Sequence, residues 1–143
     1  MVDQATIDRL VEAARQARQS AYAPYSHFAV GAAVLTRSGK VVTGCNIENA
    51  SFGLTVCAER VAIWKAVSEG ETDFLALAVV TSIDGSPCGA CRQVMAEFAL
   101  DMPVIIADLQ QIHRIATVAE LLPGAFTPDD LRNASSKRPQ TRG

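Results

Sequence analysis

The sequence contains no apolar run long enough to cross a bilayer. Its longest run, Phe74–Val80, is far shorter than the about 20 residues that a transmembrane helix needs. The first residues also lack the basic region and apolar stretch of a secretory signal. Hydrophobic residues make up 49% of the chain, which excludes a disordered protein, because such a chain lacks the apolar surface that offsets the entropy of folding. We therefore expect a soluble, cytoplasmic protein with no membrane partner.

An excess of positive charge is also missing. The formal net charge is −2, and residues 132–143 carry basic groups without any acid, so residues 1–131 hold nine basic and fifteen acidic residues. The negative net charge of residues 1–131 is a poor match for a phosphate backbone, so we expect no nucleic-acid partner. Residues 1–131 are predicted to form one domain, and residues 132–143 to form a basic, disordered tail.

Hydrophobic periodicity predicts three helices and five strands. Residues 4–21 have apolar side chains at helical spacing, which indicates an amphipathic surface helix. The apolar run of residues 74–81 is typical of a strand buried on both faces. The other predicted elements are strands over residues 28–35, 40–45, 104–107 and 112–118, and helices over residues 57–68 and 88–100, with residues 121–126 ending the ordered part. A hairpin followed by alternating helices and strands predicts an α/β fold with a mixed sheet and helices on its faces.

The four cysteines, at positions 45, 57, 88 and 91, carry the most distinctive chemistry of the sequence. Because no secretion signal is present, disulfides are not expected, and clustered cysteines favour metal binding or catalysis. Cys88-Gly-Ala-Cys91 can be a redox dithiol, half of a zinc site, or two small residues at a helix start. Pro87 suits the first turn of a helix, where the positive end of the helix dipole stabilises the thiolates that a metal requires.

A second motif, Cys57-Ala-Glu59, begins another predicted helix. Three thiolates with an open fourth position are typical of a catalytic zinc, whereas a structural zinc has four protein ligands. A cysteine or histidine followed two residues later by glutamate, together with Pro-Cys-x-x-Cys, is the pattern of zinc deaminases. One strand separates the two predicted helix starts, so both can meet at one end of the sheet. Cys57, Cys88 and Cys91 are therefore the predicted zinc ligands.

Cys45 is the alternative fourth ligand. If it bound the metal, the site would be closed and structural. It ends a predicted strand, where a free cysteine behaves as a small buried hydrophobic residue, and we favour this interpretation. His27 and His113 lack ligand spacing and are interpreted as ordinary polar residues.

Five blocks of the sequence resemble the small, homotetrameric, zinc-dependent cytidine deaminases. They are residues 21–33 (AYAPYSHFAVGAA), 44–50 (GCNIENA), 57–60 (CAER), 86–94 (SPCGACRQV) and 121–126 (LLPGAF). The order and spacing of the blocks extend the resemblance over residues 5–131. It implies a three-layer α-β-α sandwich with a mixed five-stranded sheet, a homotetramer with shared active sites, and one Zn²⁺ per subunit.

The activity implied by this resemblance is hydrolytic deamination of cytidine and 2′-deoxycytidine to uridine and 2′-deoxyuridine, with release of ammonia, in pyrimidine salvage. The resemblance also implies that zinc-bound hydroxide attacks C4 of the pyrimidine. Glu59 matches the residue that takes the proton of the water, delivers it to ring N3 and later protonates the departing amine. Without the neighbouring ligand Cys57, Glu59 would be an ordinary acid in the first turn of a helix.

The resemblance also implies a set of substrate contacts. Phe28 matches the residue that packs against the base. Asn46 and Glu48 match residues that bond the ribose 3′-hydroxyl, although alone they would be interpreted as a surface turn. The backbone N–H of Ala58 and the carbonyl of Ser86 match the partners of the pyrimidine edge.

Phe126 resembles an aromatic residue that enters the active site of a neighbouring subunit; as an isolated phenylalanine it would be interpreted as a core residue. At Phe52 many members of the family have tyrosine. A hydrogen bond from that hydroxyl is absent here, which affects a peripheral contact near the subunit junction and leaves the chemistry unchanged.

Charge counting singles out Arg60. Three thiolates and one Zn²⁺ sum to −1, whereas a site of one histidine and two cysteines is neutral. The extra negative charge weakens the metal as a Lewis acid. Arg60 follows Glu59 on the predicted helix, so its guanidinium can turn toward a thiolate and offset this charge.

Three other functions compete with this prediction. A non-enzymatic structural zinc module requires a fourth ligand and leaves Asn46, Glu48 and Glu59 without roles. A deaminase of a blasticidin-type aminonucleoside antibiotic uses the same zinc chemistry, but the sugar-binding block at Asn46-Ile-Glu48 argues against it. Editing of polynucleotides is disfavoured by the acidic body and by recognition of a free 3′-hydroxyl.

Overall fold

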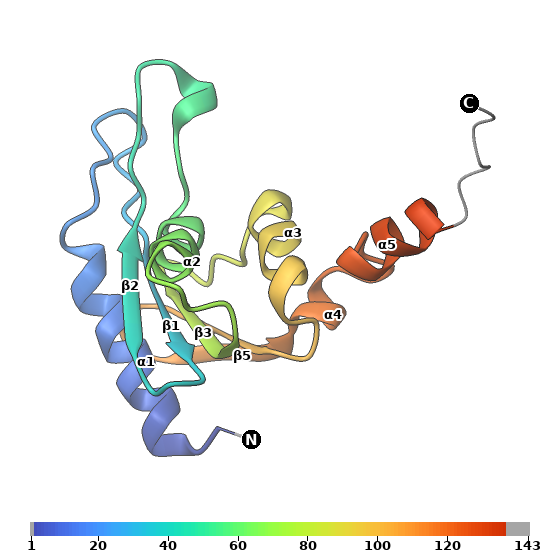
Figure 1. The fold of residues 1–143 in the computed structure, drawn as a ribbon. Helices are drawn as coiled ribbons and strands as arrows, with labels where there is room; N and C mark the ends of the chain where they lie inside the picture. Colours follow the sequence, from blue (N-terminus) through green and yellow to red (C-terminus); the bar gives the residue numbers. More distant parts are fainter. Residues whose placement is uncertain (1, 137–143) are drawn as a thin grey trace.

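A central five-stranded sheet organises the fold, which a computed structural model describes for residues 2–136 (Figure 1). The strands are β1 (Gly31–Thr36), β2 (Val41–Cys45), β3 (Phe74–Val80), β4 (Pro103–Ala107) and β5 (Ile112–Thr117). The helices are α1 (Gln4–Arg18), α2 (Ala58–Ser68), α3 (Gly89–Phe98), α4 (Val118–Leu121) and α5 (Pro128–Ser136), with a 3₁₀ turn η1 (Phe52–Leu54).

The strand order is β2-β1-β3-β4-β5. Strands β3 and β4 are parallel, and the other neighbouring pairs are antiparallel. This arrangement confirms the predicted mixed sheet. Strands β2 and β3 both pair antiparallel with β1, so they run in the same direction and end at the same end of the sheet. The helices that follow them, α2 and α3, therefore begin at that end.

Helix α1 covers one face of the sheet, and α2 and α3 cover the other face (Figure 1). Successive residues of β1 alternate between the two cores, as a pleated strand requires. Ala33 and Leu35 pack with Leu10 of α1, whereas Ala32 and Val34 belong to the core beneath α2 and α3. Strand β3 contributes to both cores, which confirms that it is buried on both faces.

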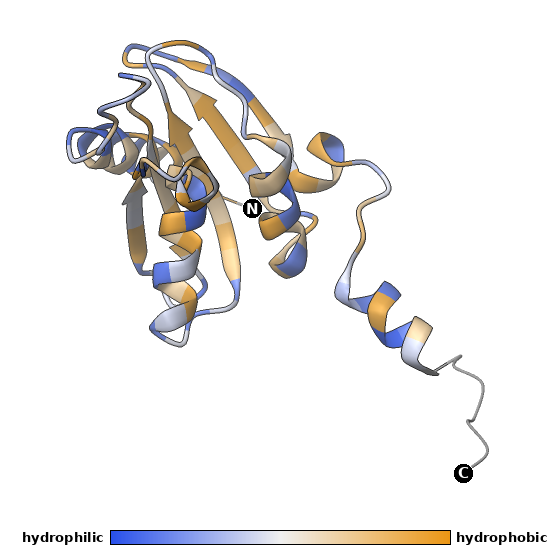
Figure 2. Cartoon of the chain, turned by 90° about the horizontal axis from the view of Figure 1, so that it is seen from above, coloured by the Kyte–Doolittle hydropathy of each residue, from blue (hydrophilic) through white to orange (hydrophobic). Residues whose placement is uncertain are grey.

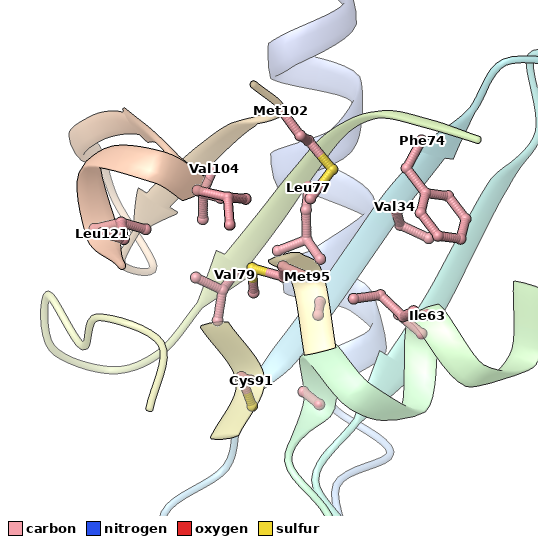
Figure 3. Close-up of a cluster of buried hydrophobic side chains, with 14 of the residues drawn as sticks. Val34, Ile63, Phe74, Leu77, Val79, Cys91, Met95, Met102, Val104 and Leu121 are labelled. Atoms are coloured by element: carbon pink, nitrogen blue, oxygen red, sulfur yellow. The ribbon is translucent and has the colours of Figure 1, made fainter. Parts of the chain in front are cut away.

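The core beneath α2 and α3 brings Ile63 of α2 and Met95 of α3 over the strands (Figure 3). Both side chains are fully buried, together with Leu77 of β3. Cys91, in the first turn of α3, is part of the same core and is 0% exposed. Apolar burial therefore fixes the N-terminal end of α3 as well as its middle.

The end of α1 differs from the prediction. The helix ends at Arg18 rather than at residue 21. The N–H groups of Gln19, Ser20 and Ala21 donate to carbonyls three residues earlier, so the last turn tightens into 3₁₀ geometry and closes the helix.

The start of β1 also differs from the prediction. The strand begins at Gly31 rather than at Phe28, because the side chain of Asn46 binds the backbone that precedes it. Its Oδ1 accepts from the N–H of Val30 at 2.9 Å, and its Nδ2 donates to the carbonyl of Phe28 at 2.7 Å. All other predicted boundaries lie within two residues of the observed ones.

The prediction that ordered structure ends at residue 126 is wrong, because α5 follows. The N–H of Thr127 donates to Asp130 Oδ2 at 2.8 Å, and the N–H of Asp130 donates to Thr127 Oγ1 at 3.4 Å, which caps the helix start. Pro128 has no N–H to satisfy in the first turn. Helix α5 includes residues 132–136 of the predicted tail, and residues 137–143 lie outside the described residues.

Helix α5 projects away from the sheet (Figure 1), and hydrophobic and hydrophilic residues follow one another along it (Figure 2). The longest helix, α1, has 15 residues. Within residues 2–136, no helix combines the length and the apolar character that crossing a membrane requires.

Helix α2 packs very closely against β2 at Gly44. A Cβ atom at this position would lie 2.5 Å from the backbone N of Ala62 and 2.6 Å from the backbone O of Ala58. Both atoms belong to the backbone of α2, so they cannot move without displacing the helix. Glycine at position 44 thus sets how closely α2 approaches the sheet.

We predict that Gly44→Ala lowers the free energy of unfolding by about 1–3 kcal/mol, because the added methyl group overpacks this contact. Gly53→Ala is the matched control, since nothing lies within 4 Å of a Cβ at that position. Urea denaturation at equal protein concentration measures both variants. If Gly44→Ala were as stable as Gly53→Ala, the close contact would not limit the position of α2.

Candidate active site

Three cysteine sulfurs converge where α2 and α3 begin. The Sγ atoms of Cys57, Cys88 and Cys91 all lie within 4.8 Å of one another, and no other group of three or more metal-binding side chains occurs among the described residues. The Cys57–Cys88 distance is 3.7 Å and the Cys88–Cys91 distance is 3.4 Å. Thiolates on a tetrahedral zinc lie about 3.8 Å apart, given a Zn–S bond of about 2.3 Å. The cluster therefore fits Zn²⁺, and Cys45 does not take part in it.

The helix starts explain how the cysteines reach this position. Cys57 is the N-cap of α2 and Cys88 is the N-cap of α3, both with extended backbone. Cys91 lies one turn into α3, and its N–H donates to Cys88 Sγ at 3.5 Å. All three sulfurs thus lie at the positive ends of two helix dipoles, which favour thiolates.

The pKa values of two of these thiols shift in opposite directions. Hydrogen bonds from Cys91, Arg60 and Cys88 lower the pKa of the Cys57 thiol to about 5, although burial opposes the shift. The pKa of Cys91 is raised, because its thiol bonds to Cys57 and is buried. Cys57 is therefore the more acidic of the two thiols.

Arg60 lies against the cysteine cluster. Its Nη2 is 3.3 Å from Cys57 Sγ, which is the contact that the charge count predicts. The Cζ atom of the guanidinium is 5.9 Å from the ring centroid of Trp64, a cation–π distance that helps to fix its orientation. The Nε atom is buried without a hydrogen-bond partner in the described part of the chain.

Glu59 is buried beside the cluster, with 4% of its surface exposed. Burial, with a smaller contribution from the Cys57 charge, raises the pKa of its carboxyl group to about 7. A carboxyl group in this range can both accept and release a proton near neutral pH. The position and the pKa suit a group that transfers protons next to a metal.

A cavity of about 240 Å³ opens beside the cluster. Its lining includes every predicted substrate contact except Phe126, namely Phe28, Asn46, Glu48, Ala58 and Ser86. Glu59 and two of the cysteines, Cys57 and Cys88, also line it. The volume is slightly below the about 300 Å³ at which pockets for drug-sized ligands begin, so the cavity suits a small molecule.

The predicted sugar-binding residues also hold the loop that precedes β1. Asn46 bonds the backbone on both sides of residue 29, as described above. Glu48 Oε1 accepts from the N–H groups of Tyr25 and Ser26, at 2.9 and 3.1 Å, and Glu48 Oε2 accepts from the Ser26 hydroxyl. These bonds, first of all from the Ser26 side chain, lower the pKa of Glu48. His27 has φ of 57°, the left-handed conformation that closes this loop.

Ser26 and Thr81 are among the lining residues that sequence reasoning missed. Thr81 is 3% exposed, and its Oγ1 accepts from the N–H groups of Ile83 and Gly85, both at 3.2 Å, so it shapes the loop before the Cys88 motif. A polar residue that ends a long apolar strand is the signal that could have identified Thr81.

Phe126 and Phe52 lie outside the cavity. Phe126 is 59% exposed, and its carbonyl accepts from Gln93 Nε2 at 2.8 Å. Phe52 is 78% exposed and meets the ring of Tyr25 edge-on, with the ring centroids 6.3 Å apart. Within one chain, neither phenylalanine contributes to the cavity lining.

The known proteins that this chain resembles are described as deaminases. The family described as "Cytidine and deoxycytidylate deaminase zinc-binding region" matches residues 4–107. A cytidine deaminase from Sporosarcina psychrophila is 50% identical over 134 residues, which cover 92% of this chain and 98% of the relative. A blasticidin-S deaminase from Bacillus cereus is 34% identical over 128 residues, which cover 82% of this chain and 90% of the relative.

A crystal structure of a cytidine deaminase from Burkholderia pseudomallei has the same fold. It superposes with a TM-score of 0.80 at 49% identity, and the match covers 83% of this chain and 98% of that structure. The sequence and the fold thus agree over nearly the whole length of these relatives, and the cysteine centre fits zinc. The chain therefore belongs to the cytidine deaminase family of zinc-dependent hydrolases.

Proposed function

We propose that this protein deaminates cytidine and 2′-deoxycytidine to uridine and 2′-deoxyuridine, releasing ammonia, as a cytoplasmic enzyme of pyrimidine salvage. The observation that carries the proposal is a single cavity lined by two of the cluster cysteines, Glu59, and the Asn46 and Glu48 side chains. A hydrolytic centre and a polar pair suited to a sugar hydroxyl thus face the same small space.

Cys57, Cys88 and Cys91 would hold the zinc. When bound, zinc lowers the pKa of water at its fourth coordination position and supplies a nucleophile near neutral pH. Glu59 accepts the proton of the attacking water, delivers it to N3 of the pyrimidine, and later protonates the departing amine. Its burial supports this role, because a desolvated carboxyl group holds a proton more readily than an exposed one.

The remaining cavity residues orient the nucleoside. Phe28 packs against the base, and the N–H of Ala58 and the carbonyl of Ser86 bind the pyrimidine edge. Asn46 and Glu48 bind the 3′-hydroxyl of the sugar. The lining of the cavity by all five residues supports these roles.

The same observations disfavour the alternatives. A structural zinc module needs a fourth protein ligand, and Cys45 lies outside the cluster of three sulfurs. A blasticidin-type deaminase would share the metal centre, so the metal does not separate the two functions. Two observations favour cytidine as the substrate: the Asn46 and Glu48 pair in the cavity, and the higher identity to a cytidine deaminase.

A homotetramer with shared active sites is part of the proposal. Several large apolar side chains are exposed on α2, on the loop before it and near α5: Ile47, Phe52, Leu54, Trp64, Phe126 and Leu131. Trp64 lies on α2, and Ile47, Phe52 and Leu54 lie on the preceding loop. A groove of about 370 Å³ is lined by Ile47, Leu54 and Trp64. Apolar surface of this kind is typical of an interface. Helix α5 projects from the sheet (Figure 1), and Phe126 is exposed on the segment before it. This exposure suits Phe126 to enter the cavity of a neighbouring subunit.

We predict that Glu59→Gln folds and binds one zinc per subunit but loses at least about a hundredfold in kcat, because an amide cannot transfer protons. Steady-state assays with cytidine, with zinc measured by atomic absorption, test this. Glu97→Gln, a change at an exposed glutamate of α3, is the control. Turnover of Glu59→Gln at the wild-type rate would refute the role of Glu59.

We predict that Arg60→Gln retains zinc but lowers kcat about ten- to a hundredfold, because a charge-assisted hydrogen bond to a metal-binding thiolate is worth roughly 1.5–3 kcal/mol. Arg60→Lys keeps the charge and should recover part of the loss. Parallel measurement of kcat and zinc content checks the prediction. Wild-type kcat in Arg60→Gln with full zinc would show that Arg60 does not tune the metal.

Mixing two inactive variants tests the shared site. Light scattering should give a tetramer for both Glu59→Gln and Phe126→Ala, each with low activity. Dissociated and reassembled mixtures should recover activity, because Phe126 of a Glu59→Gln subunit then completes the cavity of a Phe126→Ala subunit that has an intact Glu59. Mixtures that stay inactive, or a fully active monomer, would refute the shared site.

A further inference from the structure

The side chain of Arg92, on α3, bonds two other segments of the chain, the turn at residues 86–87 and the end of α4. Its Nε donates to the carbonyl of Pro87 at 2.8 Å, its Nη1 donates to the carbonyl of Leu121 at 2.6 Å, and its Nη2 donates to Ser86 Oγ at 2.8 Å. The residue is half-buried. All three nitrogens of the guanidinium are therefore engaged, each in a different direction.

Two of these acceptors belong to the turn that leads into the metal centre. Ser86 and Pro87 directly precede Cys88, and Ser86 and Cys88 both line the cavity. Arg92 itself follows Cys91 directly. The guanidinium thus reaches back over the first turn of α3 and closes a ring of chain that contains two of the three cluster cysteines.

The third acceptor lies at the end of α4. The carbonyl of Leu121 is one of the helix-end carbonyls that have no partner within the helix. Leu121 and Cys91 belong to the same buried core, and Figure 3 shows both beside the sheet. The next residue of α3, Gln93, donates to the carbonyl of Phe126 at 2.8 Å. Consecutive residues of α3 therefore hold both ends of the segment 121–126.

We propose that Arg92 is a positioning residue that fixes the turn before Cys88 and the segment leading to Phe126 as one rigid unit. It thereby sets the positions of Cys88 Sγ and of the Ser86 carbonyl in the cavity. The effect on the metal centre is independent of the substrate, whereas the effect on turnover rests on the proposed deamination.

The planar shape of the guanidinium is essential to this role. It directs donors along three fixed directions in one plane, which a lysine ammonium on a flexible stem cannot reproduce. Loss of the guanidinium leaves the carbonyls of Pro87 and Leu121 without their hydrogen-bond donor, so the turn before Cys88 relaxes. Since a displacement of about 1 Å near the reacting groups can lower a rate about a hundredfold, a relaxed turn has a measurable effect.

The test uses the full-length protein with Arg92→Gln, Arg92→Lys and the control Arg15→Gln. Arg15 is also a partly buried arginine, but it lies on α1, on the opposite face of the sheet, and its Nε makes one long bond to the carbonyl of Asp108, at 3.4 Å. Co²⁺ replaces zinc, and its ligand-field and thiolate charge-transfer bands report the geometry of the sulfurs. Zinc release to a chelator, kcat/KM for cytidine and the melting temperature complete the measurements.

We expect Arg92→Gln to bind one Co²⁺ with shifted bands, to release zinc at least tenfold faster, and to lose at least tenfold in kcat/KM. Arg92→Lys should behave like Arg92→Gln, and it supplies the test if Arg92→Gln fails to fold. Arg15→Gln should match the wild type in its cobalt bands, its zinc release and its kcat/KM. If wild-type protein did not turn over cytidine, the cobalt bands and zinc release would still test Arg92.

Two results would overturn the proposal. One is a lower melting temperature in the Arg92 variants with unchanged cobalt bands and zinc release, which would make Arg92 a purely structural link between α3 and α4. The other is full recovery of wild-type behaviour in Arg92→Lys, which would show that charge, rather than the shape of the guanidinium, is what matters.

Discussion

The site depends on one geometric constraint, that two helices must begin at the same end of the sheet and close to each other. Strands β2 and β3 meet this constraint because both are antiparallel to β1 and so run in the same direction. Burial of Cys91 and Met95 holds α3 against the sheet, and Gly44 permits the close approach of α2. The three sulfurs come together only because these packing contacts agree.

The site also shifts two neighbouring acids in opposite directions. Cys57 and Glu59 are separated by one residue, yet the pKa of Cys57 is lowered to about 5 and that of Glu59 is raised to about 7. Cys57 accepts hydrogen bonds from Cys91 and Arg60, whereas burial dominates at Glu59. Opposite shifts of this kind leave one group suited to bind a metal as a thiolate and the other suited to hold a proton near neutral pH.

Local patterns in the sequence predict much of this arrangement. The apolar run at β3 and the two cysteine motifs identify the strand and both helix starts, and a count of charges is enough to anticipate the contact between Arg60 and Cys57. Helix α5 was missed although Thr127-Pro-Asp-Asp130 contains its capping residues. The bonds of Arg92 and Asn46 could not be predicted, because they join segments whose meeting depends on the whole fold.

Asn46 and Glu48, which are proposed to bind the sugar, are already held in place by bonds to the loop before β1. Asn46 uses Oδ1 and one N–H of its amide on the backbone, which leaves a second N–H free, and Glu48 uses three of its about four lone-pair positions. One donor and one acceptor of these lining residues are therefore left for the proposed contact with a sugar hydroxyl, which can both donate and accept. Since the same two side chains fix the backbone on either side of Phe28, the groups proposed to hold the sugar and the base are already ordered relative to each other, which lowers the entropy lost on binding.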